Sequence, residues 1–416
     1  MRIAVVGAGI AGLASAHFLS RRHDVSVFEA SERIGGHANT VNVTVEGRTV
    51  AVDTGFVVFN ESNYPLFTRL LHDLEVATQP TSMSFSVSSD LSGVEYNGSS
   101  VSGLFCQRRN LVRPRFLGML LDIARFQREA PALAAAAADR KSVESFLAEG
   151  RYGRSFSEDY LMPLGSALWS VPQGTFRRFP IRLVVEFLRN HGMLRWSGRP
   201  VWKVVRGGSA RYVEKIAKPF LGNIFLRTPV AAVERRADGV RVVDRSGRAG
   251  AFEHVILACH ADQALEILQR PSARESEVLR SFPYRQNRAL LHTDPQPLPK
   301  LRRAWASWNY RVRKRSAECA TVTYNMNRLQ GIETRTLLNV TLNDFSGIDE
   351  SRILKRMSYE HPVFTSARAG LLAHRREFIA RDRTSFCGAY WGYGFHEDGV
   401  RSAVEVCRAL DRGSVA

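Results

Sequence analysis

The chain opens with the stretch Met1-Arg2-Ile3-Ala4-Val5-Val6-Gly7-Ala8-Gly9-Ile10-Ala11-Gly12, and Glu29 follows a second β-rich run from Asp24 to Phe28. The glycines have G-x-G-x-x-G spacing, between a predicted strand and a helix predicted from Ile10 to Ser20. Gly7 permits a tight turn, Gly9 lets a pyrophosphate approach the backbone, and Gly12 lets the helix pack closely on the strand. Glu29 stands where an acid binds ribose hydroxyls in such units. The stretch therefore predicts a dinucleotide-binding unit.

The residues after Glu29 favour FAD over NAD. They read Glu29-Ala30-Ser31-Glu32-Arg33-Ile34-Gly35-Gly36-His37-Ala38-Asn39-Thr40. This E-x-x-x-R-x-G-G-(basic)-x-x-(S/T) string resembles that of the flavin amine oxidase and phytoene desaturase superfamily, where it runs beneath the pyrophosphate toward the flavin. The resemblance implies that Arg33 offers charge to the diphosphate and that the glycine pair lets the backbone pass close to the cofactor.

Three later stretches carry the same resemblance. Asp53-Thr54-Gly55-Phe56 matches a D-x-G-type segment beside the flavin, and Thr228-Pro229-Val230 matches a segment whose valine reaches the adenine side of FAD through its backbone. The stretch from Ser385 to Ala403 resembles the end of these proteins, where N–H groups of the last helix point at the flavin. The residues that we expect to contact FAD are Gly7, Gly9, Ile10, Ala11, Gly12, Glu29, Ala30, Arg33, Gly35, Gly36, His37, Thr40, Asp53, Thr54, Gly55, Phe56, Val230, Gly388, Ala389, Asp398, Gly399 and Val400.

Composition limits the class of protein. The 416 residues, 44% of them hydrophobic, suffice for a large core. Five Cys without regular spacing indicate a reducing compartment and neither a disulfide framework nor a metal site, so we expect a cytoplasmic protein. The sequence contains no apolar run long enough to span a membrane. Its net charge of +18 comes without any nucleic-acid recognition module, which leaves an anionic membrane surface or an arginine-rich composition as explanations.

The fold expected from the resemblance is α/β, with a Rossmann-like FAD-binding domain interleaved with a mixed-sheet substrate domain that carries a helical cap. We expect the FAD-binding domain to comprise residues 1–80, 199–275 and 381–416. The substrate domain is expected to contain a mainly helical cap in residues 81–198 and a mixed sheet in residues 276–380.

Two basic and apolar segments stand out in the predicted cap. Between Pro114 and Arg128 an apolar stripe of Phe116, Met119, Leu120, Ile123 and Phe126 has helical spacing. An ordinary cap helix with this stripe in the core and a membrane-facing helix are the two interpretations. Arginines occur beside this stripe and again near Phe176 to Phe187, and we select Arg113, Arg115, Arg177 and Arg178 as candidates for contact with the inner face of the cell membrane.

Four β-like runs are expected to form the floor of the substrate site: Phe282 to Thr293, Ala304 to Arg311, Ala320 to Asn327 and Leu337 to Leu342. They bring aromatic residues with a few polar groups, a mixture that suits an apolar ligand. The predicted substrate cavity comprises Trp308, Tyr310 and Tyr324, with Tyr393 and Phe395 from the last motif.

The sequence departs from the amine oxidases at positions that affect activity. Their usual lysine near flavin N5 is missing from the run Tyr284 to Ala289, Ala389 stands where an acid is usual, and Phe395 replaces an aromatic-cage tyrosine. The motifs G-G-H-A-N-T-V, D-T-G-F and A-Y-W-G-Y-G-F-H-E-D-G resemble those of a bacterial set of NAD/FAD-binding proteins whose genes often sit with methyltransferases of the cyclopropane-fatty-acid-synthase type. We therefore expect hydride transfer to FAD from a methyl-branched or unsaturated acyl chain, carried on a phospholipid, with a lipid methyltransferase in the same pathway.

Other activities remain open from the sequence. They are oxidation of a polyamine or another amine, double-bond isomerisation of a fatty acid, carotenoid-type desaturation, and a regulatory or accessory role of an FAD-binding protein. For the proton acceptor we select His396, with Glu397 to orient it, because both lie in the loop beside the expected flavin. A histidine that only caps the last helix is the alternative. The sequence indicates no oligomeric state.

Overall fold

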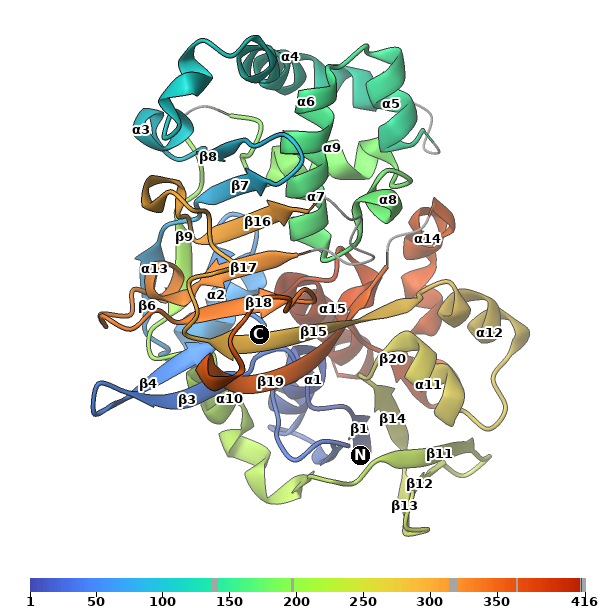
Figure 1. Ribbon diagram of the computed structural model, residues 1–416. Coiled ribbons are helices and arrows are strands. Elements are labelled where there is room, and N and C mark those ends of the chain that lie inside the picture. Colours follow the sequence, from blue (N-terminus) through green and yellow to red (C-terminus); the bar gives the residue numbers. More distant parts are fainter. Residues whose placement is uncertain (137–140, 196–197, 314–320, 364–365, 412, 414–416) are drawn as a thin grey trace.

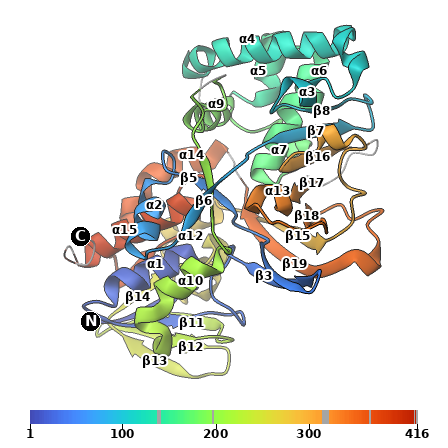
Figure 2. The ribbon, with the colours of Figure 1, turned by 90° about the vertical axis from the view of Figure 1, so that its left-hand side faces the viewer.

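The computed structural model describes residues 1–136, 141–195, 198–313, 321–363, 366–411 and 413. It consists of three stacked parts (Figure 1): a helical cap at the top, a mixed sheet in the middle and a parallel sheet with its helices below. The turned view in Figure 2 places the mixed sheet and the parallel sheet on opposite sides of a narrow waist, which β5, β6 and β9 cross.

The lower part is a five-stranded sheet in which all neighbours are parallel. Its order is β10 (Ile224–Phe225), β2 (Asp24–Phe28), β1 (Arg2–Val6), β14 (His254–Leu257) and β20 (Thr384–Phe386). Side chains alternate along β1: Ile3 and Val5 pack against helices on one face, and Ala4 and Val6 face the other. A sheet that is buried on both faces explains why β1 is apolar throughout.

Two different layers cover these faces. On one side lie α1 (Ile10–Leu19), α10 (Ala210–Ala217) and α15 (His396–Leu410). On the other side lie a small antiparallel sheet of β11 (Val230–Arg235), β12 (Val240–Asp244) and β13 (Ala249–Phe252), and the helices α11 (Ala261–Ile267) and α12 (Ala273–Arg280). The expected Rossmann-like unit is thus present, assembled from segments far apart in the sequence.

The middle part is a seven-stranded mixed sheet. Its order is β19 (Ile353–Pro362), β15 (Tyr284–His292), β18 (Asn339–Leu342), β17 (Val322–Asn325), β16 (Trp308–Val312), β7 (Phe85–Ser89) and β8 (Glu95–Asn97). Only β16 and β7 run parallel to each other; the other neighbours are antiparallel. Each of the four predicted runs overlaps one of the strands β15, β16, β17 and β18 and begins two to four residues before it. The sequence interpretation missed β19, and Met326–Gln330 is the helix α13, not the end of a strand. Ala320, the predicted start of one strand, lies outside the described residues.

The cap packs on β7 and β16. It contains α3 (Val101–Leu104), α4 (Pro114–Ala136), α5 (Val143–Glu149), α6 (Arg154–Phe156), α7 (Met162–Trp169), α8 (Gln173–Phe176) and α9 (Ile181–Asn190). The stripe of α4 is in the core: Phe116, Met119, Ile123 and Phe126 are buried. Of the two interpretations, the core helix is therefore correct for this face. Residues of the opposite face, Leu117 and Leu121, are exposed.

Short elements connect the parts. A hairpin of β3 (Thr40–Val45) and β4 (Arg48–Asp53) turns at Glu46 and Gly47, as predicted. The remaining sheet has the order β5 (Val58–Asn60), β9 (Trp202–Val205) and β6 (Thr78–Thr81), and α2 (Pro65–Asp73) lies between β5 and β6 in the sequence. No helix in the described part of the chain is long and apolar enough to cross a membrane.

Candidate active site

A cavity of about 1280 Å³ extends from the glycine turn to the cap. One end of its wall comes from the parallel-sheet part, and the other end comes from α7, α9, β16, β17 and the residues before β9. Most of the predicted site residues line it: Gly7, Gly9, Ile10, Ala11, Glu29, Ala30, Gly35, Gly36, His37, Asp53, Thr54, Gly55, Phe56, Val230, Gly388, Ala389, Trp308, Tyr324, Tyr393, Phe395 and His396. Residues separated by almost 400 positions in the sequence therefore meet at one cavity.

The glycine turn has the geometry that a diphosphate requires. Gly7 has φ +103°, and a Cβ on Gly12 would lie 1.9 Å from the Gly7 carbonyl oxygen, so helix and turn tolerate no side chain there. A Cβ on Gly9, in contrast, would meet no protein atom within 4 Å. The backbone at Gly9 thus faces open cavity at the N-terminus of α1, where N–H groups attract an anion.

Glu29 ends β2 beside this turn. One carboxylate oxygen accepts a hydrogen bond from the backbone N–H of Ala8 at 2.8 Å, and the other accepts one from the N–H of Ser31 at 2.8 Å. The side chain is therefore held in place at the cavity wall, where its remaining lone pairs can accept from ribose hydroxyls.

Arg33 and Thr40 are not among the residues that line the cavity, and their predicted contact with the cofactor stays a prediction. Arg33 donates to the carbonyl oxygens of Gly36, Ile34 and Ala38, at 2.8, 3.4 and 3.4 Å. Thr40 donates to Asp53 at 2.6 Å. The guanidinium folds back because the tight glycine turn leaves backbone carbonyls within its reach, and it stabilises the loop that the cofactor would touch.

Asp53 joins three segments below the cavity. Its carboxylate accepts hydrogen bonds from Thr40, from the backbone N–H and hydroxyl of Ser209, and from Gln330 at 3.2 Å. Burial raises the pKa of this carboxyl to about 6, against the lowering effect of these hydrogen bonds. The sequence assigned Asp53 to the flavin; the structure directs its side chain to the start of α10, where it fixes the segment that follows β9.

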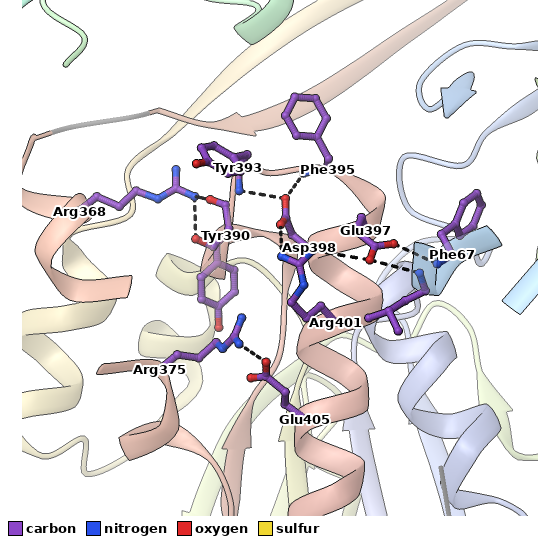
Figure 3. A network of polar contacts seen from close by, with 12 residues as sticks. Phe67, Arg368, Arg375, Tyr390, Tyr393, Phe395, Glu397, Asp398, Arg401 and Glu405 are labelled. Atoms are coloured by element: carbon purple, nitrogen blue, oxygen red, sulfur yellow. Dashed lines mark hydrogen bonds and ion pairs between the residues drawn. The ribbon is translucent and has the colours of Figure 1, made fainter. Parts of the chain in front are cut away.

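The last motif closes the cavity from below. Figure 3 shows the Asp398 carboxylate between the backbone of Tyr393 and Phe395 and the side chain of Arg401. A Cβ on Gly399 would lie 2.8 Å from Ile10, so the glycine permits α15 to approach α1. The cavity is not lined by Asp398, Gly399 or Val400. They lie behind its wall in the first turn of α15, where Val400 is already part of the hydrophobic core.

A buried arginine holds the loop that precedes α15. Arg368 is 1% exposed and donates to the carbonyl oxygens of Tyr390 and Gly392 at 2.7 and 2.5 Å (Figure 3). Burial lowers its pKa to about 10. The sequence analysis missed this residue because nothing in the short helix Ser366–Leu371 indicates that its arginine is buried.

His396, the predicted proton acceptor, and Glu397, predicted to orient it, point in different directions. His396 lines the cavity, stacks on Phe56 with ring centroids 3.5 Å apart, and forms a hydrogen bond of 2.9 Å between Nε2 and the Tyr212 hydroxyl. Glu397 accepts from the backbone N–H groups of Leu66 and Phe67 at the start of α2 (Figure 3). Glu397 therefore does not orient His396, because successive residues of a helix start diverge by about 100°.

Burial lowers the pKa of His396 to about 3. The imidazole is thus neutral at physiological pH, and protonating it would place a charge among Phe56, Phe67 and Tyr212. The geometry supports a role in positioning more than a role as a base.

A group of histidines that the sequence interpretation did not assemble lies at the cavity wall. His37, His260 and His361 all line it, and the ring centroids of His37 and His361 are 5.0 Å apart. Nδ1 of His260 lies 3.1 Å from a carboxylate oxygen of Glu360, within hydrogen-bond distance. Strand β19 supplies His361 and Glu360. The hydroxyl of Tyr359 on the same strand accepts a hydrogen bond from the side-chain amide of Asn39 at 2.8 Å and forms another with the Thr54 hydroxyl at 2.7 Å. The alternation Met357, Tyr359, His361 was the available signal for this strand.

The cap end of the cavity is aromatic. Trp308 and Tyr324 meet edge to face at 4.9 Å, and Phe395 stacks on Phe187 at 5.3 Å. The indole Nε1 of Trp308 is buried and has no hydrogen-bond partner in the described part of the chain. Tyr310 was expected here, but it lies further along β16 beneath α7 and is part of the cap core.

The wall fits a flavin dinucleotide. The open position at Gly9, the carboxylate of Glu29, the backbone at Val230 and the buried, unpartnered Nε2 of His37 line one continuous side of the cavity. These residues would hold FAD, and the bound flavin would supply a hydride acceptor. Which of them touch it stays a prediction.

Comparisons with known proteins place this geometry in a family. A family model described as flavin containing amine oxidoreductase matches residues 10–411. Putrescine oxidase, solved with putrescine bound, covers 99% of both chains at 16% identity and a TM-score of 0.69. A fatty acid isomerase from P. acnes that produces CLA covers 99% of this chain and 98% of its own at 14% identity and TM-score 0.69, and a putative protoporphyrinogen oxidase from Exiguobacterium sp. 255-15 covers 99% of both at 17% and 0.68.

A local match adds to these. An L-amino-acid oxidase of Demansia vestigiata is 51% identical over 47 residues, which are 11% of this chain and 9% of that oxidase. The chain thus matches only a small part of that relative's length. The family model spans almost the whole chain, and the structural likenesses show that the fold is shared. The chain belongs to the flavin-containing amine oxidoreductase family and is an FAD-dependent oxidoreductase.

Proposed function

We propose that this oxidoreductase desaturates an acyl chain, methyl-branched or unsaturated and carried on an anionic phospholipid. The supporting observation is the chemistry of the cavity wall at the cap end. Most of the wall there consists of aliphatic and aromatic side chains, among them Leu164, Trp169 and Phe187, and Ser170, His191 and Arg199 are polar residues in the same lining. An apolar wall stabilises a hydrocarbon chain by about 25 cal/mol for each Å² removed from water.

The same wall suits an amine poorly. The carboxylates that line the cavity are Glu29, Asp53, Glu266 and Glu360, and none of them belongs to the cap. Glu29, Asp53 and Glu360 are already engaged by backbone, hydroxyl or histidine partners. A substrate ammonium at the cap end would therefore lose its hydration without gaining an opposite charge, which is costly in an apolar site.

The reaction removes two hydrogen atoms from adjacent carbons. A bound FAD would supply the acceptor for one of them, which leaves as a hydride with its electron pair. The other leaves as a proton to a basic group or water at the cavity wall, and a carbon–carbon double bond forms. The chain's own residues enclose the acyl segment and exclude water, and an external acceptor must reoxidise the flavin.

We propose that the protein works at an anionic membrane surface. The exposed face of α4 carries Leu117 and Leu121, and the segment before it carries Leu111 and Val112, also exposed, close to Arg108 and Arg113 in the sequence. Apolar side chains beside arginines are typical of proteins that rest on a bilayer. Such a position gives access to acyl chains that do not cross water freely.

Anaerobic reduction of the bound flavin tests the acyl-chain proposal. Purified yellow protein is mixed with phospholipids bearing unsaturated or methyl-branched chains, and absorbance near the flavin maximum is followed. Bleaching by lipids, with a new double bond detected by mass spectrometry, supports the proposal. Bleaching by putrescine or another amine, and not by lipids, contradicts the proposal and indicates amine oxidation. If no candidate substrate reduces the flavin, the result indicates an accessory FAD-binding protein. Lipid profiles of cells with and without the gene then identify the chain.

A further inference from the structure

One cation lies where the apolar end of the cavity meets solvent. Arg199 lines the cavity and is exposed, and its neighbours in the wall include Met193, Val201 and Trp202. The other lining cation, Arg245, follows β12 in the lower part of the molecule. Arg199 is therefore the charged residue that a ligand of the apolar end would meet.

The guanidinium of Arg199 is available for a ligand. Its Nε donates to the carbonyl oxygen of Arg195 at 2.8 Å, which fixes the plane of the group. Among the described residues no carboxylate lies within ion-pair distance of it, whereas several other arginines of the cap, such as Arg115, Arg154 and Arg182, have an acidic partner. Its charge reaches into the cavity, since it lowers the pKa of Tyr160, which burial raises to about 12.

The remaining wall sets the class of ligand. The lining that Arg199 shares is mainly aromatic and aliphatic, with Tyr160, Leu164, Trp308 and Tyr324, and it also contains Ser170 and His191. A molecule that satisfies both parts has an anionic head and a hydrocarbon tail. The two terminal nitrogens of a guanidinium match the paired oxygens of a carboxylate or phosphate.

We propose that Arg199 binds the anionic head group of an amphiphilic acyl substrate and thereby sets how far the tail reaches into the cavity. This rests on the proposed function, because it assumes an acyl substrate. Arg199 is a specificity-determining residue in this view. A head group held at a fixed point restricts reaction to carbons at a fixed distance along the chain.

The test is equilibrium binding to the FAD-loaded protein, measured by calorimetry with oleic acid, oleyl alcohol and oleoyl lysophosphatidic acid. We expect wild-type protein to bind at least one of the two anionic ligands about fivefold more tightly than the alcohol, which corresponds to about 1 kcal/mol. The Arg199→Gln variant should lose this preference, and Arg199→Lys should retain part of it. Arg178→Gln removes the same charge from an exposed residue that does not line the cavity and should leave the preference intact.

The outcomes separate the two proposals. The role of Arg199 is overturned if the Arg199→Gln variant still prefers the anionic ligands to oleyl alcohol. It is also overturned if the wild type binds oleic acid and oleyl alcohol equally well. Neither result contradicts an acyl substrate. Failure of all three ligands to bind overturns the acyl substrate itself, and the role of Arg199 with it. A stronger preference for lysophosphatidic acid supports a phospholipid head group, and one for oleic acid supports a free fatty acid. The flavin absorbance of each variant confirms that FAD is still bound.

Discussion

Individual residues at this site have tasks that their chemistry alone does not reveal. Glu29 illustrates a residue whose task matches its motif: it is held by the N–H groups of Ala8 and Ser31 at the cavity wall. Asp53 and Arg33 illustrate the opposite, because both are turned toward the protein backbone or its hydroxyls. Both side chains therefore stabilise the loops from which they come.

Replacing Glu29 by Ala should weaken FAD retention. The variant loses a charged acceptor for ribose hydroxyls and releases the Ala8 N–H, and hydrogen bonds to charged groups contribute about 1.5–3 kcal/mol each. We expect at least about tenfold weaker FAD binding, measured by titration of apoprotein. Unchanged affinity, or a colourless wild-type protein that binds only NAD, would contradict the assignment.

The His396→Ala variant should slow flavin reduction only modestly. The buried imidazole has a pKa of about 3 and therefore accepts a proton poorly at neutral pH. Stopped-flow reduction by the substrate should slow by less than about tenfold, whereas loss of a general base costs about 10²–10⁴. A reduction rate that falls a hundredfold and cannot be restored by raising the pH would reinstate His396 as the base.

At the scale of elements, the β1–α1 unit shows how one motif serves both folding and binding. Gly12 is required by packing, because a Cβ there would meet the Gly7 carbonyl oxygen at 1.9 Å. Gly9 is not required by packing, because a Cβ there would stand in open cavity. The two glycines of one motif thus separate into a structural and a cofactor-binding position.

The variants Gly12→Ala and Gly9→Ala should differ accordingly. Gly12→Ala should lower the melting temperature of the apoprotein, because helix and turn must move apart. Gly9→Ala should leave that temperature within a few degrees of the wild type and yet weaken FAD binding, since the methyl group stands where the cofactor would pass. Thermal melts with and without added FAD measure both effects. Equal loss of apoprotein stability in the two variants would contradict this separation.

The segment from Arg108 to Arg113 and the exposed face of α4 that follows it form the surface that we expect to contact anionic membranes. Replacing Arg108 and Arg113 by Ser should release the protein from phosphatidylglycerol vesicles, since each arginine near such a surface contributes about 1 kcal/mol. Arg177 and Arg178, which the sequence also suggested, follow α8 and do not belong to the segment that carries the exposed Leu111, Val112, Leu117 and Leu121. Their replacement by Ser is therefore the comparison that removes the same charge. Cosedimentation measures binding, which should fall with salt. Equal release by both pairs would show that net charge alone is responsible.

Arg115 is left unchanged in this test, although the sequence suggested it. Its guanidinium lies 3.6 Å from the carboxylate of Asp159, which is buried, and 2.5 Å from the Ser155 hydroxyl. Removing it would leave Asp159 with a buried and less compensated charge, which destabilises a fold strongly. A loss of vesicle binding in such a variant would therefore reflect unfolding.

At the scale of the whole molecule, burial of histidines couples stability to pH. Burial lowers the pKa of His254, His292 and His361 to about 4, and that of His396 to about 3. Above pH 6.5 these groups are neutral in both states and the stability is complete. As the pH falls from 6.5 toward 4, the unfolded chain takes up protons that the folded chain cannot bind, so the folded state loses stability.

We expect the free energy of unfolding to fall between pH 7.5 and 5.5 by roughly 5 kcal/mol, since each of the four histidines contributes about 1.4 kcal/mol over this interval. Asp53 acts in the opposite direction below pH 6, because its raised pKa lets the folded state bind a proton first. Urea denaturation at pH 7.5, 6.5 and 5.5 measures the net effect. A constant or rising midpoint on acidification would show that these histidines are not buried as described.

The sequence by itself determined the glycine turn, the acid after β2, the hairpin after Thr40 and the family resemblance, because each depends on residues close together in the chain. Local backbone conformation and hydrophobic periodicity act over a few residues, so they can be read from the order of side chains. These local patterns also predicted the Rossmann-like unit that contains the parallel sheet.

Only the tertiary structure decided where side chains at the cavity point. Glu397 caps α2 and His396 bonds to Tyr212 because two remote helices pack against the start of α15. His361 joins His37 only because β19 pairs with β15. The buried Arg368 likewise acquires its partners from a loop more than twenty residues away. Such directions depend on contacts between distant segments, which no local pattern encodes.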